Sequence, residues 1–216
     1  MSRTILSPKR LLESKATNIG RIIIFCEGET EQFYFEYFSN IIKKNKYTDV
    51  KVVVENAAGN ARRVLKYANS FMSQDDNIKK FSNYDKYLVF DCDAPRDIQP
   101  VVLEASNHEE YNLLVSNYLF EVWLLMHFED VGTKLSRKKI YEHLSNYLHS
   151  EYVKADRGII REIIQNGNVE QAIVNAKDSE DKYLGNGYKI SSNIKEMNPY
   201  SNVYKLIEEF MVEISQ

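Results

Sequence analysis

The stretch RIIIFCEGETEQFYFEYF, residues 21–38, places two carboxylates, Glu27 and Glu31, where a strand should turn into a helix. RIIIFC is a short continuous apolar run rich in Ile, which is typical of a strand buried on both faces. After Gly28, Thr30 is a residue type that caps helices, and the aromatic residues that follow recur at helical spacing. The stretch therefore predicts a strand, a turn and a helix capped by Thr30, with Glu31 placed to favour the helix N-terminus.

The same alternation of strand and helix continues down the chain. Further strands are predicted at VKVVVEN (50–56), DKYLVFDCD (85–93) and EYNLLVSN (110–117). Asn60 is expected to cap a helix after the second strand, and YLFEVWLLMHF, residues 118–128, predicts a buried helix. Strands that alternate with helices indicate a parallel α/β sheet.

From about Thr133 onward the pattern is helical. Ser136 and Asn168 are expected to cap two helices, and Asn198 with Pro199 predicts the start of the last one, YSNVYKLIEEFMVEI. We divide the chain into an N-terminal arm (1–20), an α/β core (21–130) and a helical extension packed on that core (131–216).

Composition narrows the function classes. The net charge of −3 over 216 residues gives no general attraction to polyanions, so nucleic-acid binding would need a local basic patch. No run of eighteen apolar residues and no secretory signal is present, and the two cysteines, Cys26 and Cys92, suit buried reduced thiols. A cytoplasmic protein without membrane contact is predicted, and a disulfide between the two cysteines stays open.

Three carboxylates follow predicted strands. Glu27 and Asp91 come directly after strands, and Asp93 follows two residues later. Because functional groups of parallel sheets collect where the strands end, these three acids are expected to converge. Close carboxylates repel one another unless a cation compensates them, and oxygen ligands without a nearby His favour Mg²⁺ or Mn²⁺. Each motif alone fits a helix cap or turn equally well, but together they predict a divalent metal site.

The motifs resemble known proteins. IIIFCEG and YLVFDCD are similar to the TOPRIM domain, whose first strand ends in Glu and whose third ends in Asp-x-Asp. CEGETEQFYFEYF, VFDCDAP, SNYLFEVWLLMHF and NPYSNVYKLIEEF together resemble the RloB-like family over roughly residues 20–212. Tyr118 stands where the family pattern usually has Pro.

The resemblance implies a TOPRIM-like three-layer fold and a Mg²⁺-dependent nuclease that cleaves phosphodiester bonds in DNA or RNA. It also implies a role in anti-phage defence, often with an ATPase partner. By resemblance Glu27 would be general acid or base and a metal ligand, while Asp91 and Asp93 would hold metal. Glu31 and Glu121 are further candidates. Glu121 lies in an apolar helix, where a charge needs either a salt-bridge partner or a metal.

Basic residues are candidates for substrate contact. Those expected to bind phosphate or the nucleic-acid backbone are Arg62, Arg63, Lys134, Arg137, Lys138 and Lys139, although runs of this kind are usually simply solvated. Lys154 and Arg157 could extend such a surface. His127 could act as a base, but a single His at the end of an apolar helix is more often a packed residue.

Two other function classes stay open. A non-enzymatic module could bind an ATPase partner through its many aromatic side chains, 15 Tyr and 10 Phe. A haloacid-dehalogenase-type phosphatase would use Asp91 as nucleophile and Asp93 as acid or base. Against the phosphatase, Ala94 and Pro95 follow the motif, where that class continues to Thr or Val.

Overall fold

A five-stranded sheet forms the centre of the computed structural model, which describes residues 19–44, 48–54, 60–93, 98–107 and 110–215. Residues 1–18 of the predicted arm, and residues 55–56 and 94–95, lie outside these ranges. The strands are β1 (Arg21–Cys26), β2 (Asp49–Val54), β3 (Asp85–Asp91), β4 (Tyr111–Asn117) and β5 (Tyr200–Ser201). They are arranged in the order β2-β1-β3-β4-β5, with β1 to β4 parallel and β5 antiparallel to β4.

Ten helices surround the sheet in the described part of the chain. They are α2 (Glu29–Ile41), α3 (Ala61–Met72), α4 (Asp75–Phe81), α5 (Ile98–Ser106), α6 (Phe120–Leu125), α7 (Arg137–Leu148), α8 (Arg157–Asn166), α9 (Val169–Gly185), α10 (Ile190–Asn193) and α11 (Tyr204–Ile214). The predicted α/β class is confirmed, whereas α4, α5, α8 and α10 were not predicted as individual helices.

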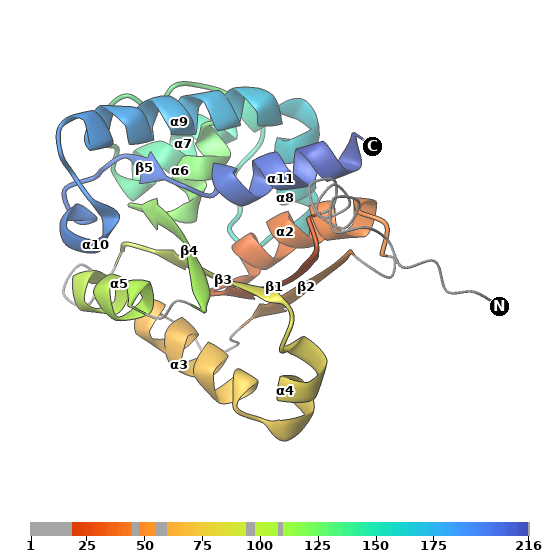
Figure 1. The fold of residues 1–216 in the computed structure, drawn as a ribbon. Coiled ribbons are helices and arrows are strands. Elements are labelled where there is room, and N and C mark those ends of the chain that lie inside the picture. Colours follow the sequence, from red (N-terminus) through yellow and green to blue (C-terminus); the bar gives the residue numbers. More distant parts are fainter. Residues whose placement is uncertain (1–18, 45–47, 55–59, 94–97, 108–109, 216) are drawn as a thin grey trace.

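The helices form layers on both sides of the sheet. In Figure 1, α2, α8, α9 and α11 lie above the sheet, and α3, α4 and α5 lie below it. Strand β1 packs against the helices of both layers, because its successive side chains point to opposite faces of the sheet. Ile22 and Ile24 pack with α2, α6 and α11, whereas Ile23 and Phe25 pack with α3 and α5. The continuous apolar run of β1 is thus explained by burial on both faces.

Three predicted helix caps are confirmed. The side chains of Asn60, Ser136 and Asn168 each accept a hydrogen bond from the backbone N–H three residues further on. These short polar side chains satisfy N–H groups that have no partner within the first turn of a helix.

The predicted cap at Thr30 was wrong. Helix α2 begins at Glu29 with Gly28 as its N-cap, so Thr30 lies inside the first turn and is buried. Thr30 Oγ1 instead accepts a hydrogen bond from the backbone N–H of Ala155, at 3.1 Å. This bond ties the start of α2 to the connection between α7 and α8.

The predicted start of the last helix was also wrong. Tyr200 and Ser201 form β5, which pairs antiparallel with the end of β4, and α11 begins only at Tyr204. Asn202 extends this contact: its backbone N–H and its side-chain amide make hydrogen bonds to Val115 and Leu113 of β4. The sheet is therefore mixed, because the chain returns from the helical extension to cover β4.

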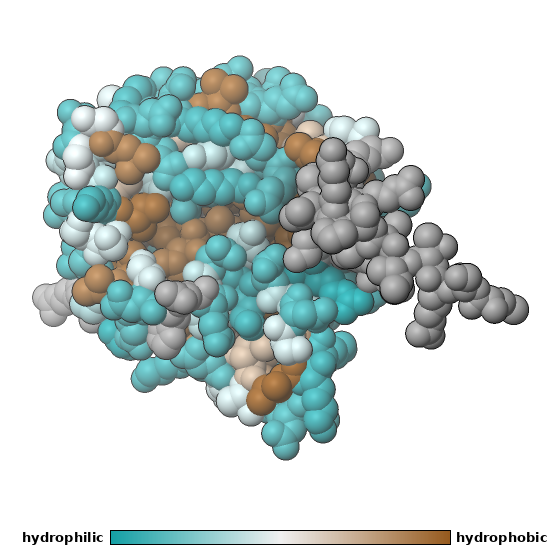
Figure 2. All heavy atoms as spheres, in the orientation of Figure 1, coloured by the Kyte–Doolittle hydropathy of each residue, from teal (hydrophilic) through white to brown (hydrophobic). Residues whose placement is uncertain are grey.

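The surface is mostly polar where α9 covers it (Figure 2), and neither cysteine forms a disulfide. Figure 2 shows mostly hydrophilic residues over α9, with apolar residues visible between the two helical layers. Cys26 and Cys92 are buried and free, as predicted. Among the described residues, no helix has the length and apolar character needed to span a membrane.

Candidate functional site

The ends of β1 and β3 bring two predicted site residues together. Glu27 follows the last residue of β1, and Asp91 is the last residue of β3, the strand that pairs with β1 in parallel. The backbone N–H of Asp91 donates a hydrogen bond to Glu27 Oε2 at 3.3 Å. The parallel register thus places both acids at one edge of the sheet, as the sequence predicts.

Glu31 contributes a third carboxylate from the first turn of α2. Its side chain is only 2% exposed, and Oε2 has no hydrogen-bond partner among the described residues. A Cβ at Gly28 would lie 3.1 Å from Glu31 Oε2. Gly28 therefore leaves room for this carboxylate.

Glu121 contributes a fourth carboxylate from α6 and is fully buried. Its Oε1 accepts hydrogen bonds from the hydroxyl groups of Tyr152, at 3.1 Å, and Tyr141, at 3.4 Å. Lys154 Nζ lies 3.9 Å from the same oxygen, whereas Oε2 has no partner among the described residues. Glu121 therefore has a lysine partner, as a structural role requires, and its role as a metal ligand stays a prediction.

Lys154 lies beside these acids, whereas the sequence suggested only that it could extend a basic surface. It lies between α7 and α8, next to Ala155, whose φ of 59° is unusual for a residue with a Cβ. Burial alone would lower the pKa of Lys154. The negative charges of Glu121, Asp91 and Glu31 raise this pKa by more than burial lowers it, so the pKa of Lys154 is raised overall. No local motif marks this lysine, because its importance depends on partners that are distant in sequence.

The electrostatics of this acidic cluster, defined as Glu27, Glu31, Asp91 and Glu121, are unfavourable without more positive charge. Burial, followed by the charge of Glu31, raises the pKa of Glu27 to about 8. Burial raises the pKa of Glu31 to about 7, and Glu121 adds to the effect. Burial and the charges of Glu31, Glu121 and Glu27 raise the pKa of Asp91 well above its usual value. One lysine does not balance four carboxylates.

The residues present fit a hard divalent cation. Three buried carboxylate oxygens lack hydrogen-bond partners in the described part of the chain: Glu31 Oε2, Asp91 Oδ1 and Glu121 Oε2. In their present positions, no three His, Cys, Asp or Glu side chains of the described residues are grouped closely enough to hold a metal together. Mg²⁺ retains several waters and needs only one or two carboxylates, so unpartnered oxygens are the more relevant observation.

Asp93 lies apart from the unpartnered oxygens. Its carboxylate is 31% exposed and accepts a hydrogen bond from Arg137 Nη2 at 3.1 Å. It remains near enough to raise the pKa of Glu27. The structure thus joins Glu27 and Asp91 directly but directs Asp93 toward the start of α7.

Comparison with known proteins identifies the family. The model of the RloB-like protein family matches residues 22–210, which include the whole acidic cluster and Lys154. The chain belongs to the RloB-like family. No curated protein and no solved structure matches this chain.

The other basic candidates of this RloB-like protein differ in their surroundings. Arg62 forms an ion pair with Glu104 of α5 at 3.2 Å, and Lys138 pairs with Glu142 within α7. Arg63 and Lys139 lie on exposed helix surfaces. Arg137 forms an ion pair with Asp93, one of the predicted acids, and Lys134 lies near Arg137.

His127 is a packed residue in this RloB-like protein. Its ring is buried between the hydroxyl group of Tyr34, 3.1 Å from Nε2, and the backbone carbonyl of Trp123, 3.1 Å from Nδ1. Burial lowers the pKa of His127 to about 4. The imidazole is therefore neutral and fully engaged near pH 7, which argues against a role as catalytic base.

Proposed function

We propose that this RloB-like protein is a TOPRIM-type nuclease that uses Mg²⁺ or Mn²⁺ to hydrolyse phosphodiester bonds. The observation that carries the proposal is the hydrogen bond between Asp91 N–H and Glu27 Oε2, within a cluster of carboxylates that includes three unpartnered buried oxygens. The proposed role in anti-phage defence, with an ATPase partner, rests on the family resemblance alone.

Glu27 is the proposed general acid or base. Its pKa of about 8 allows it to hold or release a proton near neutral pH, which is the range where proton transfer by a carboxyl group is most effective. The Asp91 N–H fixes one oxygen of this carboxyl group, so its orientation is set by the backbone of β3. Because a backbone group holds the Glu27 carboxyl group, no rearrangement of side chains is needed before it transfers a proton.

We propose that the metal is held by residues from the set Asp91, Glu31 and Glu121, which differ in how far their oxygens are already engaged. Asp91 and Glu31 each have one buried oxygen free to accept a cation, and Glu121 is held by Tyr141, Tyr152 and Lys154. A bound Mg²⁺ would stabilise the charge that develops on the phosphate. Asp93, paired with Arg137, is proposed to contact the metal shell or the substrate from the rim of the site.

The test is cleavage of labelled single-stranded and duplex DNA and RNA in the presence of Mg²⁺. Glu27→Gln and Asp91→Asn are expected to lower the cleavage rate by at least about 100-fold, the usual scale for a lost acid-base group. Glu29→Gln is the matched control, because Glu29 lies two residues from Glu27 and is exposed. Unchanged cleavage in both site variants, with folding intact, would refute the proposal. Formation of a beryllium fluoride adduct on the Asp91 carboxylate, which mimics an aspartyl-phosphate, would favour a phosphatase instead.

A further inference from the structure

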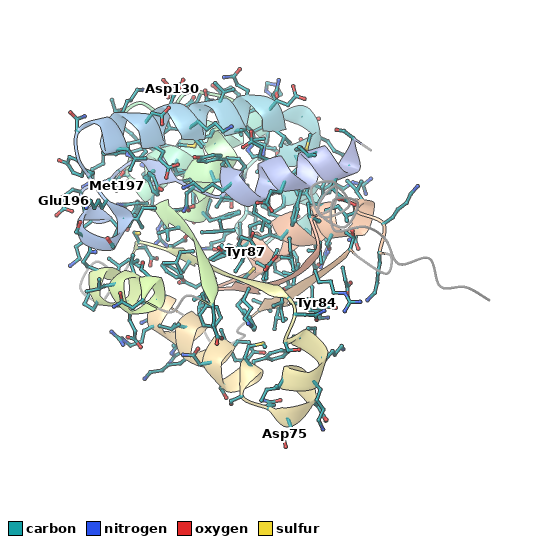
Figure 3. All side chains as sticks on the ribbon, viewed as in Figure 1. Asp75, Tyr84, Tyr87, Asp130, Glu196 and Met197 are labelled. Atoms are coloured by element: carbon teal, nitrogen blue, oxygen red, sulfur yellow. The ribbon has the colours of Figure 1, made fainter. Side chains whose placement is uncertain are left out.

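A cavity of about 380 Å³ opens beside the acidic cluster. The ends of β3 and β4, the start of α7 and the segment after α10 surround it, and its lining includes Cys92, Tyr118, Lys134, Arg137, Lys195 and Asn198. Figure 3 labels Glu196 and Met197 in the segment that supplies Lys195 and Asn198. Four separate parts of the chain thus converge on one hollow.

Two residues of the cavity lining, Cys92 and Arg137, adjoin or contact residues of the candidate active site. Cys92 immediately follows Asp91, and its backbone N–H donates a hydrogen bond to Ser116 of β4 at 2.9 Å. Arg137, from the opposite wall, bonds to Asp93 at 3.1 Å. A molecule in the cavity would therefore lie directly beside the end of β3.

Positive charge gathers around the cavity, although the protein as a whole carries a charge of −3. Lys134, Arg137 and Lys195 come from three different positions along the chain. Lys134 and Lys195 are exposed, and no ion pair of either one occurs within the described residues. Two ammonium groups next to a guanidinium suit the oxygens of a phosphate.

An aromatic ring forms part of the same wall. Tyr118 is half-buried, and the guanidinium carbon of Arg137 lies 5.9 Å from its ring centroid. Nucleobases stack on tyrosine rings and on arginine planes in sites for single strands. The volume is near the lower end of the range for small-ligand sites and matches one nucleotide rather than a duplex.

We propose that this cavity binds one unpaired nucleotide of a single-stranded nucleic acid. Tyr118 contacts its base, and Lys134 and Lys195 contact its phosphate. Arg137 connects the cavity to Asp93, so the bound nucleotide neighbours the bond presented to the acidic cluster. The position of that bond rests on the proposed nuclease function, but nucleotide binding itself can be measured independently.

The experiment measures binding of fluorescein-labelled single-stranded DNA, single-stranded RNA and duplex DNA to the full chain, by anisotropy with Ca²⁺ in place of Mg²⁺. The double variant Lys134→Ala/Lys195→Ala is expected to lower the affinity for at least one single strand about tenfold or more. Its matched control is Lys79→Ala/Lys80→Ala, which removes the same charge from exposed positions on α4 outside the cavity lining. A plot of log affinity against log salt concentration has a negative slope. Its magnitude should decrease by about 0.7 for each phosphate that the variant no longer binds.

Tyr118 provides a second, independent variant. Tyr118→Leu should weaken single-strand binding by about 5- to 100-fold, the usual effect of removing one base stack, while Tyr118→Phe should retain it. Thermal unfolding of both variants shows whether the fold persists, and the lysine pair decides the question if Tyr118→Leu does not fold. Mononucleotides should compete with the single strand for wild-type protein but not for the lysine double variant.

Two outcomes would overturn the inference. Equal loss of affinity in both lysine pairs would indicate a general surface charge, and unaffected single-strand binding in the cavity variants would exclude the cavity. Failure of this inference is distinct from failure of the proposed function. If the protein cleaves nucleic acid but the cavity variants bind it as well as wild type does, only the cavity inference is refuted. If binding depends on the cavity residues but no cleavage occurs, only the proposed nuclease function is refuted.

Discussion

Lys154 Nζ lies 3.9 Å from Glu121 Oε1, and it is the cation that faces the acidic cluster from the connection between α7 and α8. The lysine side chain is 44% exposed, whereas the glutamate is fully buried. The ammonium group therefore reaches from the surface toward the buried carboxylates of Glu31, Asp91 and Glu121. Its charge partly offsets their repulsion.

Lys154→Met should destabilise the metal-free protein near pH 8. Removal of one partner of a buried pair costs about 3–5 kcal/mol, and we expect about 1–2 kcal/mol here because Lys154 is partly exposed. The melting temperature should fall by about 2–4 °C for each kcal/mol. Millimolar Mg²⁺ should restore more stability to this variant than to wild type. Lys138→Met, an exposed control, should change little, and equal effects of the two variants would contradict the prediction.

Stability without metal should fall as the pH rises from about 4.5 to about 8. The pKa of Glu27 is about 8 and that of Glu31 about 7 in the folded protein, against 4.5 in an exposed chain. The folded state binds these protons more tightly than the unfolded state does, so protonation favours folding and ionisation opposes it. Below about pH 4.5 these groups are protonated in both the folded and the unfolded state, so they no longer make stability depend on pH.

Thermal unfolding across this pH range, in the presence of a chelator, measures the effect. Asp91→Asn should flatten the pH dependence, because it removes a carboxyl group whose own pKa burial raises well above its usual value. Glu29→Gln should leave it unchanged. A wild-type stability that is level between pH 5 and 8 would show that the carboxylates are less strongly coupled than their burial indicates.

His127 should produce the opposite dependence at lower pH. Its pKa is about 4 in the folded protein against 6.5 in an exposed chain, so the folded state requires the neutral ring. Stability from this group is complete above about pH 6.5 and declines as the pH falls toward 4. His127→Gln should lose about 1–3 kcal/mol at pH 7, from the broken bonds to Tyr34 and Trp123, and should show a weaker decline in acid. Identical acid limbs for the variant and wild type would contradict this.

Gly167→Ala should destabilise the fold by about 1–3 kcal/mol through overpacking. A Cβ at this position would lie 2.7 Å from both His127 Cβ and the backbone oxygen of Ile163. Gly185→Ala is the control, because a Cβ there meets nothing within 4 Å. Urea unfolding of both variants should separate them, and similar midpoints would exclude close packing as the reason for Gly167.

The sequence predicts those parts of the fold whose signals are local. The strand β1 follows from its apolar run, and the caps at Asn60, Ser136 and Asn168 follow from short polar residues before helical patterns. Glu27 and Asp91 could be placed together because parallel strands end at one edge. Each of these inferences needs only neighbouring residues and a general rule of sheet geometry.

Features that depend on distant contacts were missed. Thr30 has the chemistry of a cap, but its hydroxyl group bonds to Ala155, which lies 125 residues away. Pro199 has the position of a helix start, but the next two residues pair with β4. Lys154 resembles a surface cation in the sequence because nothing near it in sequence indicates Glu121. The assignments of nuclease activity, metal and defence role remain predictions.

Asn202 has a consequence for the exposed side of β4. Its backbone N–H donates to the carbonyl of Val115, its Oδ1 accepts from Val115 N–H, and its Nδ2 donates to the carbonyl of Leu113. These groups belong to the outer edge of β4, which an unpaired strand would offer to another chain. One asparagine after a two-residue strand thus occupies hydrogen-bonding groups that would otherwise invite edge-to-edge aggregation, and the sheet is closed on this side by a side chain rather than by a full strand.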